Sequence, residues 1–383
     1  MRVVSIVLGL SGAISANSAV FAAASVNDRV AKDWDYNGRV ILGHIGYDIC
    51  EWDARSGKLL WRLPGHTEQI VSAELSPDGR RAITTSYYPP NEAGIPSKDT
   101  STRLWDLVQG RQIKELDGEI GRGFSADGHR ILTVKSGDGT ALAFIGDENT
   151  GERLGTFQVA GNDVAFSPSG REICANDGGG FTYVYDSRTG VEVGRCELTD
   201  GFRRHVKFGT NDGTLLGYDT YCAELWDIKA NKPIVEISNE KDKQIADMNR
   251  APLSVPEAAL DKNGTLVLTP AWFGANLYET KSGRLAFHLE APATCWAIDL
   301  SPGGNYALVQ SLESLSGGPF VGTAWDLRKR KLVRKFGDTP VCFSKDGKTF
   351  LTETEHDLGY KNLTVYSSET GAILRRIDLH SMK

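Results

Sequence analysis

Trp52-Asp53-Ala54-Arg55-Ser56-Gly57 joins an aromatic residue and an acid to a turn that ends in glycine. Variants of this stretch return seven more times, with the acid position at residues 106, 147, 186, 227, 279, 326 and 367, at intervals of 39 to 53 residues. Aspartate, asparagine and glycine are the residues that tight turns between strands require. The repeat therefore predicts eight copies of one small structural unit.

A second glycine turn lies about half a repeat before each acid. It reads Asp35-Tyr36-Asn37-Gly38 in the first copy, where residues 30–34 are expected as strand a, Ser76-Pro77-Asp78-Gly79 in the second and Ser344-Lys345-Asp346-Gly347 in the last. Short apolar stretches flank both turns, so each unit reads as strand a, glycine turn, strand b, loop, strand c, acid–glycine turn, strand d. Such a unit cannot bury its face alone. We predict an all-β fold, a single β-propeller of eight four-stranded antiparallel blades, each made from contiguous chain. One alternative is that N-terminal residues pair with the last blade, and another is seven blades with an irregular extra unit.

The N-terminus predicts export. Met1-Arg2 precedes an apolar run from Val3 to Ile14, which is followed by small residues up to Ala24. This is the pattern of a signal peptide with an A-x-A-like cleavage site. The run is shorter than the roughly 20 residues that span a bilayer. We expect residues 1–24 to be a signal peptide and residues 25–383 a WD40-like propeller domain. The mature chain would be periplasmic or secreted, with no membrane insertion after cleavage.

The second unit resembles a WD40 repeat. Gly65-His66 precedes the turn at residues 76–79, and Thr84, Asp99 and Trp105-Asp106 follow at that family's spacing. The resemblance implies a hydrogen-bonded structural brace inside the blade, formed by His66, Thr84, Asp99 and Trp105. The other units lack an acid six residues before the aromatic position. The resemblance therefore covers nearly the whole chain as a spacing, but only one unit as a full motif.

The acid–glycine turns also resemble those of eight-blade quinoprotein-like propellers, in which a tryptophan docks on the turn. Asp53, Ser56-Gly57 and Trp61 match that pattern, and Asp186 with Thr189-Gly190 matches it in part. The resemblance implies one alternative function, an enzyme or cofactor-binding propeller. A further alternative is an envelope-assembly scaffold, similar to the eight-blade propeller lipoproteins of outer-membrane assembly.

Composition and motifs argue against several functions. The net charge of −6 provides no basic face for nucleic acid. The run of basic residues at 328–335 falls on a predicted c–d turn and strand d, and we interpret it as a solvated turn. The six cysteines are spaced as buried free thiols, and the seven histidines show no metal-ligand pairing. No HExxH or GxSxG motif occurs. We therefore expect no catalytic residue, cofactor or metal, and no enzyme activity.

The lengths of the units vary unevenly. Extra residues fall in the b–c loops of units two and seven and in the connection between units five and six, whereas the a–b and c–d turns stay short. Insertions on one face of a repeat array commonly mark a binding side. We predict a monomeric scaffold that binds a protein or peptide partner on this face. Its candidate binding residues are the loop aromatics Tyr87, Tyr88, Trp272, Phe273, Phe320 and Tyr360.

Overall fold

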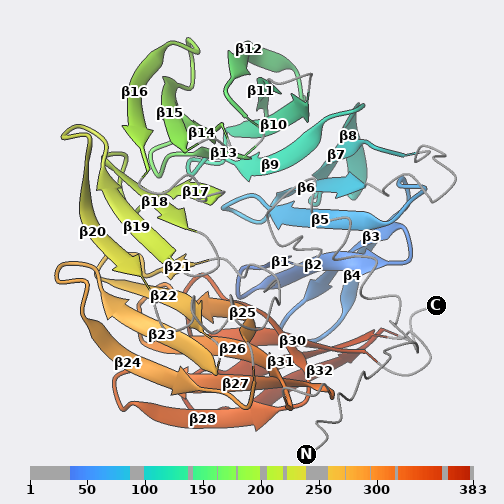
Figure 1. The fold of residues 1–383 in the computed structure, drawn as a ribbon. Coiled ribbons are helices and arrows are strands. Elements are labelled where there is room, and N and C mark those ends of the chain that lie inside the picture. Colours follow the sequence, from blue (N-terminus) through green and yellow to red (C-terminus); the bar gives the residue numbers. More distant parts are fainter. Residues whose placement is uncertain are drawn as a thin grey trace, which may run out of the picture.

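The computed structural model describes residues 35–86, 99–136, 141–161, 163–177, 180–198, 205–218, 222–238, 258–271, 273–293, 295–314, 318–355 and 361–379. Every regular element in this part of the chain is a β-strand. The strands form eight antiparallel sheets, each built from four strands consecutive in the sequence. Figure 1 shows these sheets as blades around a ring, with β12, β16, β20, β24 and β28 on its outside. The predicted eight-bladed β-propeller is confirmed.

The first four blades cover the N-terminal half of the ring. They are β1 (Asp35–Tyr36), β2 (Val40–Ile45), β3 (Asp48–Asp53) and β4 (Leu59–Leu63); β5 (Ile70–Leu75), β6 (Arg81–Ser86), β7 (Thr102–Asp106) and β8 (Arg111–Leu116); β9 (Ile120–Phe124), β10 (Arg130–Ser136), β11 (Ala141–Asp147) and β12 (Arg153–Val159); and β13 (Asp163–Phe166), β14 (Glu172–Asn176), β15 (Phe181–Asp186) and β16 (Glu192–Glu197).

The last four blades complete the ring. They are β17 (His205–Phe208), β18 (Thr214–Tyr218), β19 (Cys222–Asp227) and β20 (Lys232–Ser238); β21 (Ala259–Leu260), β22 (Leu266–Ala271), β23 (Gly274–Glu279) and β24 (Leu285–Glu290); β25 (Cys295–Leu300), β26 (Tyr306–Leu312), β27 (Phe320–Asp326) and β28 (Lys331–Phe336); and β29 (Thr339–Phe343), β30 (Thr349–Glu355), β31 (Lys361–Ser367) and β32 (Ile373–Asp378).

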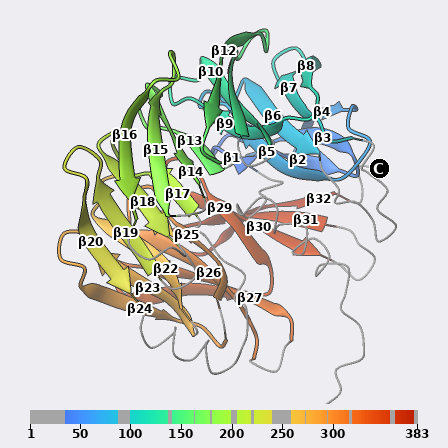
Figure 2. The same ribbon diagram turned by 45° about the horizontal axis from the view of Figure 1, so that its top comes forward.

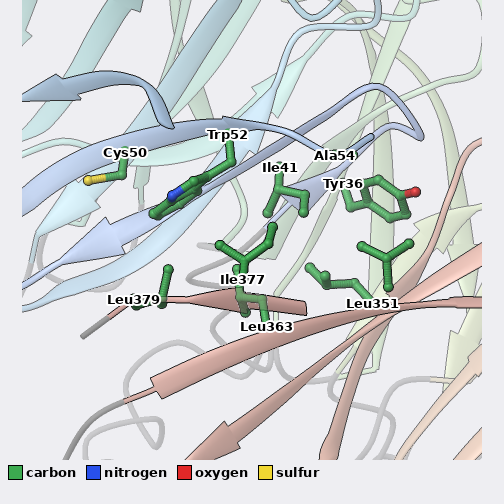
Figure 3. Packing of buried hydrophobic residues seen from close by; sticks show 10 residues of the cluster. Tyr36, Ile41, Cys50, Trp52, Ala54, Leu351, Leu363, Ile377 and Leu379 are labelled. Atoms are coloured by element: carbon green, nitrogen blue, oxygen red, sulfur yellow. The ribbon is translucent and has the colours of Figure 1, made fainter. Parts of the chain in front are cut away.

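The ring closes by packing blade one against blade eight. Tyr36, Ile41 and Trp52 of blade one share a buried apolar cluster with Leu363 and Ile377 of blade eight, as Figure 3 shows. The Tyr36 hydroxyl also lies 2.7 Å from Thr349 Oγ1. Among the described residues, no strand of one blade joins the sheet of another. Closure therefore depends on side-chain packing, as the prediction of blades made from contiguous chain requires.

The aromatic–acid repeat forms the c–d turn of each blade. The pairing of strands c and d is irregular in all eight blades just before the aromatic position, for example between Glu51 and Trp52. Such bulges increase strand twist and re-aim side chains. The acid that follows accepts hydrogen bonds from the turn. Asp53 Oδ1 lies 2.6 Å from both Ser56 N and Ser56 Oγ, and these bonds lower the pKa of Asp53.

Two features of the c–d turn explain why it ends in glycine. It adopts a positive φ, +63° at Gly110, which side chains disfavour. It also lets the outer strand of the preceding blade dock on the turn. A Cβ atom on Gly110 would lie 2.3 Å from the Trp61 ring, and one on Gly190 would lie 2.5 Å from Phe157. The tryptophan predicted to dock does so, on the turn of the neighbouring blade.

Two details of the sequence prediction change. Asp35 and Tyr36 were expected in the first a–b turn, but they form β1, which pairs with β2. The turn is shorter because Asn37 Oδ1 accepts the backbone N–H groups of Arg39 and Val40, at 2.9 and 3.0 Å. Residues 30–34, expected as strand a, lie outside the described residues.

The cysteine prediction is confirmed for the five side chains that the structure describes. None of the five is part of a disulfide; four of them are buried and the fifth is partly buried, and they are Cys50, Cys174, Cys196, Cys295 and Cys342. Burial raises the pKa of Cys50 to about 12 and that of Cys196 to about 11. Thiols with such raised pKa values hold little of the reactive thiolate.

Candidate functional site

The antiparallel order of each blade separates its connections into two sets. The a–b and c–d turns lie at one end of the strands, and the b–c and d–a connections lie at the other. We call these the short-turn face and the long-loop face; the blades that carry them are seen from two angles in Figures 1 and 2. The four longest connections between strands run from Ser86 to Thr102, Glu197 to His205, Ser238 to Ala259 and Leu312 to Phe320, and all four belong to the long-loop face.

Two of the six candidate binding residues lie within the described part of the chain. Phe273 follows β22 in blade six and is 45% exposed. Phe320 begins β27 in blade seven and is half-buried. Both belong to b–c connections of neighbouring blades, hence to the long-loop face. The other four, Tyr87, Tyr88, Trp272 and Tyr360, lie outside the described residues.

Phe273 combines an exposed ring with a fixed backbone. Ala291 N, in the connection that leaves the blade, donates a 2.9 Å hydrogen bond to Phe273 O. The next residue, Gly274, has φ +129°, and a Cβ atom there would lie 1.8 Å from Leu289 O. Only glycine fits this position, so the turn is held tightly. The structure thus presents an aromatic ring to solvent at little ordering cost, which favours contact with a partner.

The four residues of the predicted brace lie in one hydrogen-bonded chain inside blade two. Trp105 Nε1 lies 2.8 Å from Thr84 Oγ1, and Thr84 Oγ1 lies 2.8 Å from His66 Nε2. His66 Nδ1 lies 3.2 Å from Asp99 Oδ2. Asp99 also accepts the backbone N–H groups of Thr67 and Ser101, at 2.9 and 3.0 Å. These hydrogen bonds join strands b and c of blade two to its two long-loop connections, which carry His66 and Asp99.

Burial determines the state of His66, and the hydrogen bonds fit that state. The Trp105 indole N–H only donates, and the Asp99 carboxylate only accepts. In the neutral imidazole, His66 Nδ1–H donates to Asp99 and Nε2 accepts from the Thr84 hydroxyl. Burial lowers the pKa of His66 to about 4. Although burial opposes it, hydrogen bonds from Ser101 and Thr67 lower the pKa of Asp99 to about 2.

The neutral imidazole makes the stability of blade two depend on pH. The unfolded chain binds a proton at His66 near pH 6.5, whereas the folded chain does so only near pH 4. Stability is therefore lost as the pH falls through this window. We expect wild type to lose about 2 kcal/mol more than His66→Gln between pH 6.5 and 5. Urea unfolding of both proteins at the two pH values tests this, and parallel losses would show that His66 is protonated in the fold.

Blades three and eight contain two further braces that the sequence did not predict. In both, a carboxylate takes the place of the histidine. In blade three, Glu119 accepts from the Thr133 hydroxyl and from Arg153. In blade eight, Asp338 accepts from the Thr352 hydroxyl at 3.0 Å and from the Tyr366 hydroxyl at 3.2 Å. A glycine precedes each acid, as it precedes His66. A glycine followed by a polar residue after strand d is therefore the sequence feature that could have predicted these braces.

Four acids on the innermost strands join neighbouring blades. Each accepts a backbone N–H from the first strand of the next blade, at 2.8 to 3.3 Å; the pairs are Asp35 with Leu75, Glu74 with Phe124, Asp163 with Val206, and Asp299 with Phe343. Carboxylates near the axis are the groups that an active site at the mouth of the ring would use. Here they stabilise the contacts between blades, which favours a structural role.

The most perturbed carboxyl lies away from the axis. Glu51, on β3, is 4% exposed, and burial raises its pKa to about 7. Its neighbours in the layer between blades one and two are apolar, and its carboxyl makes no hydrogen bond to another described residue. Among the described residues, no three His, Cys, Asp or Glu side chains lie together in a way that could hold a metal ion. In the same residues, no helix is long and apolar enough to cross a membrane.

These features define the class of the protein: an eight-bladed β-propeller with degenerate WD40-like repeats. The model of the WD domain, G-beta repeat, matches residues 57–106, which include β5, β6 and β7 of blade two and the four residues of its brace. A crystal structure described as the eukaryotic initiation factor superposes with a TM-score of 0.56 at 13% identity, covering 91% of this chain and 88% of that one. That likeness supports the fold.

Three curated proteins share parts of this sequence. Eukaryotic translation initiation factor 3 subunit I of Bombyx mori is 26% identical over 38% of this chain and 46% of its own length. Autophagy-related protein 16 of Arabidopsis thaliana is 25% identical over 60% and 44%. The WD repeat-containing protein SL1-17 of Schistosoma mansoni is 25% identical over 51% and 64%. The chain thus spans less than two thirds of the length of each of these relatives.

Proposed function

We propose that this chain is an exported, non-enzymatic propeller that binds a protein or peptide partner through its long-loop face. One observation carries the proposal: the four longest connections between strands and the exposed Phe273 all belong to that face. The opposite face consists of short turns whose acids are occupied in capping those turns. WD40-like propellers commonly act as interaction scaffolds, which agrees with this division. The apolar run after Met1 supports export.

Affinity capture with the mature chain, residues 25–383, tests the proposal. Bait protein is exposed to an envelope extract, and the captured proteins are compared with those held by Phe273→Ala and by a variant with Tyr87, Tyr88 and Trp272 changed to alanine. We expect both variants to lose the same captured protein, because aromatic anchors carry much of an interface's binding energy.

A matched control removes apolar surface from the short-turn face. Val108, in the c–d turn of blade two, is 60% exposed, and Val108→Ala should leave capture unchanged. Equal capture by all variants would rule out the long-loop face as the docking surface. Loss of capture in Val108→Ala alone would move the interface to the short-turn face.

A further inference from the structure

The outer rim of blade seven carries an unusual concentration of positive charge. Residues 327–337 include six lysines and arginines and no acid, in a chain whose net charge is −6. They form the c–d turn that follows β27 and the whole of β28, the outermost strand of its sheet. The outermost strand of blade eight, β32, adds Arg375 and Arg376.

Four of these side chains have structural roles. Arg375 Nε donates a 3.0 Å hydrogen bond to the backbone oxygen of Arg55. Arg328 lies over the Tyr306 ring, 5.8 Å from its centroid. Lys329 Nζ lies 3.1 Å from Asp326 Oδ2. Arg334 donates a 2.9 Å hydrogen bond to the backbone oxygen of Gly371, in the c–d turn of blade eight. The last contact also shows that the rims of the two blades meet here.

The remaining basic side chains are available. Lys331, Lys335 and Arg376 are exposed. In the part of the chain that the structure describes, none of the three forms an ion pair. Arg330 is exposed as well, and the nearby Glu279 is already paired with Arg284, at 2.9 Å. We call Arg330, Lys331, Lys335 and Arg376 the basic rim.

Arg330 occupies a position that the other blades give to smaller residues. Its φ is +51°, in the left-handed region. Six blades have glycine at this place in the c–d turn, with φ between +63° and +74°, and blade five has Asn231. Asparagine tolerates this conformation, but a long side chain adopts it at a cost. A residue kept in a disfavoured conformation points to a use for its side chain.

The strands of the basic rim suggest what it binds. β28 and β32 are the outermost strands of their sheets, so among the described strands each pairs along one side only. Leu332 and Leu374, 39% and 53% exposed, lie on the same two strands as these charges. An extended peptide can add to such an edge through main-chain hydrogen bonds, while its side chains meet those of the edge strand. Charge complementarity requires that peptide to be acidic.

We propose that the basic rim of blades seven and eight binds an extended acidic peptide segment of a partner protein. This site lies at the periphery, and its turn belongs to the short-turn face, so it is separate from the long-loop face. The basic rim is narrow, because it occupies only the outer edges of two sheets, and the protein as a whole carries a net negative charge. A flat anionic membrane or a nucleic acid would meet net repulsion beyond it.

Fluorescence anisotropy of a labelled decaglutamate peptide with the mature chain tests the proposal. Changing Lys331, Lys335 and Arg376 together to glutamine should weaken binding about tenfold, because three charge pairs are lost. A matched control changes three exposed lysines in the c–d turns and edge strand of blades five and six, Lys229, Lys232 and Lys281, and should leave binding unchanged. No binding by wild type, or equal losses in both variants, would overturn the proposal.

Arg330→Gly separates binding from folding. Glycine suits the positive φ, so this variant should raise the thermal midpoint while weakening peptide binding. A rise in the midpoint with unchanged binding would contradict the role given to Arg330. Vesicles of phosphatidylserine and a DNA duplex serve as rival probes at the same salt concentration. Tighter binding to either, lost in the triple variant, would assign the basic rim to another class of ligand and overturn the proposal.

Discussion

Trp105→Ala should lower the free energy of unfolding by about 4 kcal/mol, the largest loss that we expect from a single substitution. The Trp105 side chain is 1% exposed and belongs to the apolar cluster between blades one and two. Its ring packs so closely on Gly65 that a Cβ atom there would lie 2.7 Å from Trp105 Cη2. Alanine would leave a large cavity, and Thr84 would lose the donor of its 2.8 Å hydrogen bond.

Urea unfolding measures this loss, with Trp325→Ala in blade seven as the matched control. Trp325 occupies the equivalent place in its blade, but it is only half-buried, and its indole bonds to Thr323 of the same strand at 3.0 Å. We expect about half the effect there, because less apolar surface is removed from the core. Equal losses in the two variants would show that the brace of blade two adds nothing to ordinary packing.

Glu51→Gln should stabilise the protein at pH 8 by about 3 kcal/mol and leave its stability near pH 4 almost unchanged. Burial raises the pKa of Glu51 to about 7 from its ordinary value of 4.5. The fold therefore favours the protonated carboxyl. Its contribution is complete below pH 4.5 and is lost as the pH rises through 7. Glutamine is neutral at every pH and escapes this loss.

Thermal unfolding of wild type and Glu51→Gln at pH 4 and pH 8 checks the prediction. Glu192→Gln is the control, because Glu192 is exposed in the outer strand of blade four. The pH dependence of His66 has the opposite sign but is common to all three proteins, so it cancels in their differences. A Glu51→Gln variant no more stable than wild type at pH 8 would mean that the carboxylate finds a polar partner.

Blade number was predictable because it depends on local chemistry. Each c–d turn has a side-chain oxygen at the acid position and a residue with a positive φ, as Asp53 and Gly57 illustrate; in blade eight the oxygen belongs to Ser367. These requirements act within six residues, so they leave a pattern in the chain. The brace of blade two was predictable for a similar reason, since His66, Thr84, Asp99 and Trp105 match a known spacing.

Contacts between blades were harder to predict, because they join residues about 40 positions apart without a fixed residue type. Asp35 could be read as a turn residue until the structure placed its carboxylate 2.8 Å from Leu75 N. The braces of Glu119 and Asp338 were not predicted for another reason. Each places a carboxylate, which only accepts hydrogen bonds, where the brace of blade two has a histidine. The run at 328–335 reads as a solvated turn in sequence, and only the positive φ of Arg330 distinguishes it.

The division of the ring into a structural face and a binding face is the central claim. Amide hydrogen exchange of the mature chain, with and without a partner obtained by capture, tests it most directly. We predict that the partner protects the b–c and d–a connections, including the turn at Phe273, and leaves the a–b turns at their unbound rates. Protection confined to the a–b and c–d turns, with the long-loop connections unchanged, would contradict it.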